Sequence, residues 1–202
     1  MRYFVFDLET TGLPQRKSFN SYYSFKDFSK FAKARIVSIA WSIYENKHKI
    51  MSKYHIIRPN DFEIIDNSIA TSINNITNDI AKSKGVDFTN VIEELIIDLE
   101  NVELLVAHNL KFDKNILLAE LHHIGRYDLI QKILLISTFC TMKHGKNITR
   151  LHNPRYPKDF KYPKLTELYF HFFGHEFINA HNAEVDVNAC AKCYQKIIGI
   201  IK

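Results

Sequence analysis

YFVFDLETTG, residues 3–12, is the stretch that decides the fold. An apolar run, which predicts a buried strand, leads into two carboxylates and a turn. Side chains alternate between the faces of a strand, so Asp7 and Glu9 point the same way, roughly 7 Å apart along the backbone. Two acids on one face repel each other, and a divalent cation with oxygen ligands is the usual compensation. The alternative is a solvated strand end with two idle carboxylates.

A second apolar strand is predicted in residues 104–113, LLVAHNLKFD. It runs into Asn109, a candidate N-cap, and then into a helix over residues 110–123 that ends before Gly125. Asp113 falls in the first turn, where the helix dipole favours a negative charge. Taken alone, Asp113 is better explained as an ordinary acid at a helix start.

The third informative segment is HNAEVD, residues 181–186. Asn182 can cap a terminal helix, and Asp186 then falls one turn into it, beside the apolar stripe. His181 precedes the helix, so an imidazole and a carboxylate can approach one point in space. The alternative for His181 is a cap or surface residue.

In this order and at these separations, the three segments resemble the DEDDh branch of the DnaQ-like 3′–5′ exonucleases, in the RNase H-like superfamily. The five-residue step from His181 to Asp186 is typical of the His branch, because the Tyr branch uses a Tyr-x-x-x-Asp spacing. The resemblance spans residues 2–198, so we expect a single exonuclease domain over residues 1–202. It implies an α/β fold: an RNase H-like mixed sheet, antiparallel in its first three strands and then parallel, flanked by helices.

The resemblance also implies roles. Asp7, Glu9, Asp113 and Asp186 would hold two divalent cations, and His181 would be the general base. Two metals about 3.5–4 Å apart activate a water and stabilise the charge of an in-line displacement. All-oxygen ligands favour Mg²⁺, with Mn²⁺ able to substitute, over zinc. Expected substrate contacts are Thr10, Thr11, Leu13, His108, Asn109 and Phe112. The chain departs from the family pattern at Asn74, where members commonly carry His, and at Ser137, where many carry Asp.

The net charge of +5 is unevenly distributed. Residues 15–35 hold six basic residues and one acidic residue, residues 141–164 hold seven and one, and the rest of the chain holds fourteen and twenty. We interpret both segments as basic, aromatic-containing loop insertions that bind a polyanion, with base stacking on aromatic rings. For Phe25, Phe28 and Phe31 the alternative is one apolar face of a short helix packed on the core.

Composition predicts an intracellular protein, cytoplasmic or nucleoid-associated. There is no signal-peptide pattern and no run of 18 apolar residues. Three cysteines give no disulfide framework, and Cys190 and Cys193 are interpreted as small core residues. Elsewhere the pattern predicts a hairpin of strands over 35–44 and 49–58, a helix over 88–99, a short strand over 133–136 and a helix over 165–173.

Three functional hypotheses follow. The first is a metal-dependent 3′–5′ exonuclease acting on single-stranded or frayed DNA, with DNA favoured over RNA and a polymerase or repair partner in trans. The second keeps the same site and makes RNA the substrate, a choice that depends on contacts to the 2′-OH. The third is a non-catalytic nucleic-acid-binding module, which would predict the loss of at least one of the five catalytic positions, and all five are intact.

Overall fold

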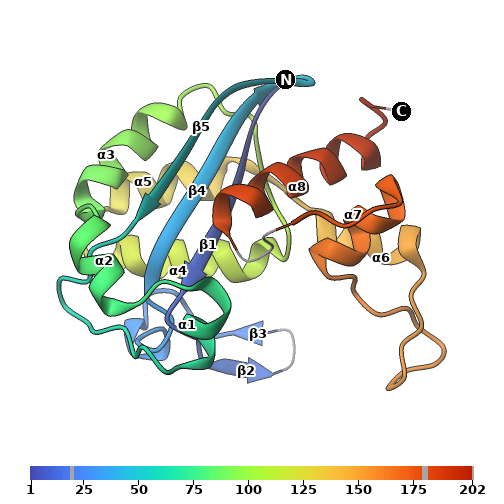
Figure 1. Cartoon of the computed structure of the whole chain (residues 1–202). Helices are drawn as coiled ribbons and strands as arrows, with labels where there is room; N and C mark the ends of the chain where they lie inside the picture. The colour runs from blue at the N-terminus through green and yellow to red at the C-terminus, as the bar shows by residue number, and fades with distance from the viewer. Residues whose placement is uncertain (19–20, 179–181, 202) are drawn as a thin grey trace.

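The computed structural model describes residues 1–18, 21–178 and 182–201 (Figure 1). A five-stranded sheet runs in the order β5-β4-β1-β6-β7. Its strands are β1 (Arg2–Thr10), β4 (Ile36–Glu45), β5 (His48–Ile56), β6 (Leu104–Ala107) and β7 (Ser137–Cys140). The first three pair antiparallel, and β1–β6 and β6–β7 pair parallel. This order and pairing confirm the predicted RNase H-like mixed sheet. Parallel neighbours require crossover connections, and here helices supply them.

Eight α-helices and one 3₁₀ helix are found in the described part of the chain. They are η1 (Phe28–Lys30), α1 (Ile69–Asn74), α2 (Asn78–Lys84), α3 (Phe88–Asp98), α4 (Leu110–His123), α5 (Tyr127–Leu135), α6 (Thr141–Thr149), α7 (Leu165–Phe173) and α8 (Ala183–Ile197). The predicted helices over 110–123 and 165–173 are confirmed at both ends, and that over 88–99 to within one residue. None of these helices combines the length and apolar character that a membrane crossing requires.

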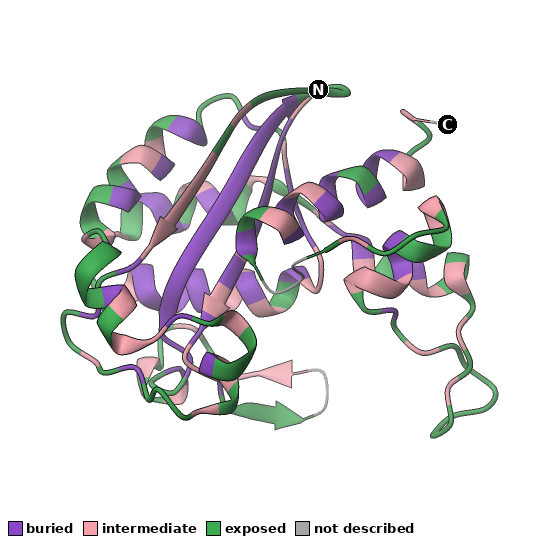
Figure 2. Ribbon diagram, in the orientation of Figure 1, coloured by how far each residue is buried: buried purple, intermediate pink, exposed green. Residues whose placement is uncertain are grey.

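The alternation of β1 assigns its side chains to two separate apolar layers. Tyr3 and Val5 pack under α8, while Phe4 and Phe6 join the larger core that α3, α4 and α5 cover. β4 is buried along nearly its whole length, which places it and β1 at the centre of the sheet (Figure 2). Because Asp7 and Glu9 continue the alternation of Tyr3 and Val5, they face the α8 side.

The predicted strand over 133–136 is wrong. Residues up to Leu135 belong to α5, and the edge strand β7 begins at Ser137. The buried positions Leu129, Ile130 and Ile133 recur at helical spacing, whereas Leu134 and Leu135 are exposed. A short apolar run does not distinguish a strand from a buried helix turn, which explains the error.

Residues 141–164 are only partly a loop. Their first nine residues form α6, which packs closely against α7: a Cβ at Gly145 would lie 2.8 Å from Leu168. The rest projects as an extended arm, closed by an isolated bridge between His152 and Phe160 (Figure 1).

Residues 15–35 form the small hairpin β2 (Arg16–Ser18) and β3 (Ser21–Tyr22), followed by η1. Phe31 is buried, and Phe25 and Phe28 are partly buried against the core. The core-packing alternative therefore holds for these phenylalanines, although the expected helix is a three-residue 3₁₀ turn. Tyr22 is partly exposed, and the Arg16 guanidinium lies 5.2 Å from its ring centre.

Candidate active site

Three carboxylates from two distant segments meet at the end of β1. One ligand atom each of Asp7, Glu9 and Asp186 lies within 4.8 Å of the others. Asp186 comes from the first turn of α8. The start of that helix is fixed by Asn182, whose side chain accepts hydrogen bonds from the backbone N–H groups of Glu184 and Val185, as the sequence predicted.

A fourth carboxylate reaches the same strand end from α4. Asp113 lies in the first turn of that helix and is only 2% exposed. Its Oδ1 accepts a hydrogen bond from the backbone N–H of Leu8 at 3.3 Å, and Leu8 lies between Asp7 and Glu9 in β1. We call Asp7, Glu9, Asp113 and Asp186 the acid cluster.

The acid cluster is electrostatically costly as it stands. Burial raises the pKa of Asp7 well above its ordinary value, and the charges of Asp113, Asp186 and Glu9 raise it further. Burial, and after it the charge of Asp186, raises the pKa of Glu9 to about 8. Among the described residues, no lysine or arginine forms an ion pair with Asp7, Glu9 or Asp113. An all-oxygen set of this kind suits a hard divalent cation such as Mg²⁺.

His108 is held by protein groups on both sides of its ring. Its Nε2 lies 3.0 Å from the Pro163 carbonyl oxygen and its Nδ1 lies 3.0 Å from Thr141 Oγ1. Burial lowers the pKa of His108 to about 4, so the ring is neutral at pH 7. Nε2–H therefore donates to Pro163, and Nδ1 accepts from Thr141. Because both nitrogens are engaged, His108 contributes shape to the cavity wall and links β6 to α6.

Asn109 occupies the predicted N-cap position of α4, but it does not cap the helix through its side chain. Its side chain makes no capping hydrogen bond, and its backbone is left-handed, with φ 62°. Asparagine tolerates this conformation better than most residues, which allows the sharp turn from β6 into α4. Its role at this position is thus in the backbone geometry that aims the first turn of α4 at β1.

Two cavities meet beside the acid cluster. One of about 570 Å³ holds all four carboxylates together with His108, Asn109 and Phe112. The other, of about 560 Å³, is largely apolar; its lining includes Leu13, Ile69, Ile73, Asn74 and Phe112. Leu8, Glu9 and Phe112 line both cavities, so an apolar recess lies next to the carboxylates.

The Thr10-Thr11-Gly12 turn is fixed by its own hydrogen bonds. Thr10 Oγ1 donates to the Gly12 carbonyl at 2.7 Å, and Thr11 Oγ1 donates to the Lys33 carbonyl at 3.2 Å. A Cβ at Gly12 would lie 2.8 Å from that same carbonyl oxygen, so the close approach requires glycine. Both threonines line the apolar cavity, but their hydroxyls serve the turn.

Sequence reasoning did not identify α1 as part of this region. Ile69 and Ile73 are exposed and line the apolar cavity one helical turn apart. Asn74 Nδ2 donates to the Thr10 carbonyl at 3.4 Å, so this departure from the family pattern supports the turn. The sequence does carry a signal for this helix. Ser68 caps α1, and apolar residues follow it at spacing i, i+4. His181 lies outside the described residues.

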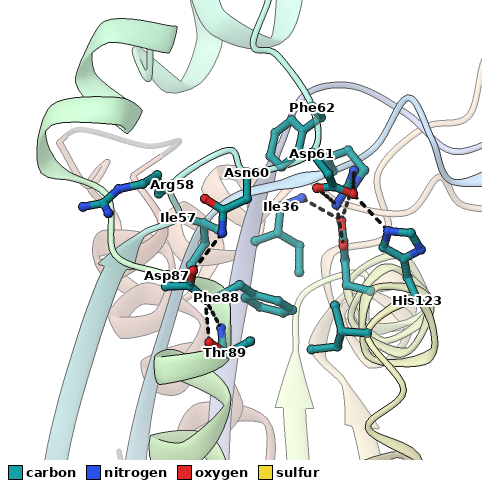
Figure 3. A pocket seen from close by; sticks show the side chains of 13 residues that line it. Ile36, Ile57, Arg58, Asn60, Asp61, Phe62, Asp87, Phe88, Thr89 and His123 are labelled. Atoms are coloured by element: carbon teal, nitrogen blue, oxygen red, sulfur yellow. Dashed lines mark hydrogen bonds and ion pairs between the residues drawn. The ribbon is translucent and has the colours of Figure 1, made fainter.

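A second polar cluster lies around a smaller cavity of about 200 Å³ (Figure 3). Arg35 pairs with Glu120 at 2.7 Å and with Asp61 at 2.8 Å, and His123 Nε2 lies 2.9 Å from Asp61. The guanidinium also lies 4.4 Å from the ring centre of Phe62. We call Arg35, Asp61, Glu120 and His123 the arginine cluster. Its carboxylates are compensated within the protein, in contrast to the acid cluster.

Comparisons with known proteins agree on the kind of protein. Residues 4–194 match the model of the RNase_T exonuclease family. No match is found among curated proteins. A solved structure of exonuclease X in complex with 5′ overhanging duplex DNA is similar with TM-score 0.59 and 20% identity, over 98% of this chain and 91% of that one.

Two exonuclease I structures are similar over nearly the whole of this chain. That of E. coli exonuclease I in complex with a dT13 oligonucleotide has TM-score 0.70 and 17% identity, over 97% of this chain and 40% of that one. That of exonuclease I from Methylocaldum szegediense has TM-score 0.64 and 15% identity, over 96% and 40%. The chain thus spans about two fifths of these exonuclease I chains. At these identities the likeness supports the fold.

Proposed function

Because the chain belongs to the RNase_T exonuclease family, we propose that it is a metal-dependent 3′–5′ exonuclease that releases nucleoside 5′-monophosphates from single-stranded or frayed DNA ends. The observation that carries this proposal is the meeting of Asp7, Glu9 and Asp186 within 4.8 Å, with Asp113 against the same strand. The direction of digestion is taken from the likeness of the three sequence segments to the DEDDh branch.

The proposed cofactor fits the residues present. Four carboxylates without nitrogen or sulfur ligands suit two Mg²⁺ ions, with Mn²⁺ able to substitute. When bound, such ions lower the pKa of a water and stabilise charge on the phosphate oxygens. In the proposal Asp7, Glu9, Asp113 and Asp186 hold the ions, and His181 accepts the proton of the attacking water.

The apolar cavity beside the acids is the proposed site of the terminal nucleotide. Leu13 is 67% exposed and lines this cavity together with Ile69 and Ile73. Phe112 lines both cavities and so offers an aromatic surface between the base and the carboxylates. Aromatic and aliphatic surfaces bind bases with little sequence preference, because every base has an apolar face.

DNA is the favoured substrate because similar solved structures contain it. Exonuclease X is described with 5′ overhanging duplex DNA and E. coli exonuclease I with single-stranded DNA oligonucleotides. The uneven charge of this chain supports a polyanionic partner in general, since its basic residues concentrate in residues 15–35 and 141–164.

Digestion of labelled oligonucleotides tests the proposal. DNA and RNA strands of one sequence, labelled at the 5′ or the 3′ end, are incubated with Mg²⁺ or with chelator. We expect a ladder from 5′-labelled DNA and immediate release of mononucleotide from 3′-labelled DNA, both abolished by chelator. If the protein digests the RNA strand and not the DNA strand, the substrate is RNA. Binding without hydrolysis in any metal would reject the nuclease and favour a binding module.

A further inference from the structure

A basic groove lies on the side of α4 that faces away from the acid cluster. Its volume is about 470 Å³, and it separates α4 from β7 and α6. The rim carries Lys111, Lys114, Lys143 and His144, and among the described residues no acidic side chain lines the groove. The apolar floor consists of Phe25, Leu110, Leu118 and Cys140, and the exposed Leu134 also lines the groove. We call this the lysine groove.

Helix periodicity separates the two faces of α4. Lys111, Lys114 and Leu118, at spacing i, i+3 and i+7, share the face that lines the lysine groove. Asp113 belongs to the opposite side and lines the cavity of the acid cluster. The groove and the carboxylates therefore lie about one helix diameter apart, roughly 10–12 Å.

Two of the groove lysines, Lys114 and Lys143, carry charges that no counter-charge in the described part of the chain balances. Among the described residues, no carboxylate forms an ion pair with Lys114 or Lys143. Lys114 is partly buried, and that burial lowers the pKa of its ammonium. Partial desolvation without a counter-charge makes an anion a favourable partner. His144 stacks on Phe139 with ring centres 3.8 Å apart, which fixes one wall of the groove.

Tyr22 lies near one of the lysines of the groove. The Lys111 ammonium lies 5.9 Å from the centre of the Tyr22 ring. Burial raises the pKa of Tyr22, and the Asp113 carboxylate adds to the effect against the opposing charge of Arg16. The ring thus lies close to Lys111, in the first turn of α4. An aromatic ring at this position offers a stacking surface to a strand that passes from one face to the other.

We infer that the lysine groove holds the phosphate backbone of the substrate strand several nucleotides 5′ of the scissile bond, an inference that rests on the proposed function. The cationic rim and the apolar floor of the groove match a single nucleic-acid strand, because its phosphates are anionic and its bases have apolar faces. To place further phosphates in the groove, a strand must therefore extend about one helix diameter beyond the scissile phosphate. Longer strands can reach the groove, whereas the one internucleotide phosphate of a dinucleotide is the scissile phosphate, so none is left for the groove.

The test compares two variants of equal charge. Lys114→Gln/Lys143→Gln removes two positive charges from the groove, and Lys82→Gln/Lys84→Gln removes two from exposed positions on α2, which no cavity described above includes (Figure 1). Binding of fluorescent oligo-dT of 2–12 nucleotides is measured by anisotropy in chelator over a range of salt. Hydrolysis of the same strands is measured with Mg²⁺.

For the groove variant we expect Kd and KM for the 12-mer to rise at least about 10-fold while kcat and all dinucleotide values stay at wild type. The slope of log Kd against log salt should fall by about 1.4, since each phosphate contact on a single strand contributes about 0.7. The α2 variant should match wild type. Equal behaviour of the two variants, or a loss that extends to the dinucleotide, would overturn the inference.

Two measurements keep the outcomes separate. Melting scans show whether the change at the partly buried Lys114 causes a folding defect. If it does, Lys143→Gln alone, at an exposed position, should lower the salt slope by about 0.7. Absence of hydrolysis by the wild-type protein would count against the proposed function, whereas the length dependence of binding in chelator tests the groove without catalysis.

Discussion

The acid cluster and the arginine cluster each contain a buried carboxylate, and they differ in how the charge of that carboxylate is balanced. Glu120 is 4% exposed and Asp113 is 2% exposed, so both carboxylates leave water. Arg35 pairs with Glu120 at 2.7 Å, whereas the acid cluster gathers further carboxylates around Asp113. The extent of burial therefore does not distinguish the two clusters. The sign of the charge next to the buried carboxylate does.

The difference appears in opposite pKa shifts. Burial would raise the pKa of Asp61, but hydrogen bonds from Arg35 and His123 lower it below its ordinary value. The pKa of Asp7 is raised both by burial and by its neighbours. A compensated cluster stabilises the fold by joining residues 15–35, the segment after β5 and α4. An uncompensated cluster in a cavity of about 570 Å³ indicates a site that a cation completes.

The largest expected effect is on catalysis. Asp7→Asn should lower the hydrolysis rate at least about 10⁴-fold, because bound metal supplies much of a rate enhancement that in enzymes is about 10⁶-fold or more. Asp61→Asn, a matched change in the arginine cluster, should leave kcat within a few fold. Oligonucleotide binding by both variants controls for folding. Normal turnover by Asp7→Asn would break the comparison.

His181→Ala should cost about 10²–10⁴ in kcat, the usual scale for a general base. The pH–rate profile should also lose its acidic limb, because a general-base histidine must be neutral to accept the proton. His48→Ala is the control, because His48 is exposed and starts β5 at the end of the sheet away from Glu9. A lower rate with an unchanged pH profile would assign His181 a positioning role.

In the arginine cluster the effect should be on stability. Glu120→Gln leaves the Arg35 charge buried and partly unpaired, so the free energy of unfolding should fall by about 3–5 kcal/mol. Glu100→Gln changes an exposed acid and should stay within about 0.5 kcal/mol of wild type. Denaturant titrations measure both. If the two variants unfold alike, Arg35 and Glu120 do not stabilise the fold as we argue.

The sequence predicts the elements of the acid cluster better than its surroundings. The alternation in β1, the Asn182 cap and the length of α4 are local patterns, and each places its carboxylate correctly on its element. The family resemblance was needed to bring the three segments together, since no local pattern reports a contact between Leu8 and Asp113, 105 residues apart.

The errors arise where tertiary contacts override local preference. Asn109 looks like a cap, but the turn from β6 into α4 requires a left-handed residue there. The contribution of α1 to the apolar cavity and the pairing of Arg35 with Glu120 depend on segments that meet only in the folded chain. Composition alone does not show which acidic residues have a basic partner in the folded chain.

The smallest effect, and the most direct measure of the difference, is the pH dependence of stability without metal. The pKa of Glu9 is about 8 in the folded protein and 4.5 in its ordinary state, so between these values the folded state binds more protons. Stability in chelator should therefore fall as the pH rises from about 4.5 to about 8. Glu9→Gln should flatten this slope and raise the pH 8 melting temperature by a few degrees, since about 1 kcal/mol corresponds to about 2–4 °C for a domain of this size.

Added Mg²⁺ should reverse the slope for the wild type, because ligation requires deprotonated carboxylates and becomes tighter as the pH rises. Glu100→Gln should retain the wild-type slope in chelator, because that exposed carboxylate lies outside the acid cluster. Melting scans at pH 5, 6.5 and 8, with and without Mg²⁺, provide the measurement. Stability that rises with pH in chelator, to the same extent in wild type and Glu9→Gln, would mean that Glu9 is solvated or paired like the acids of the arginine cluster.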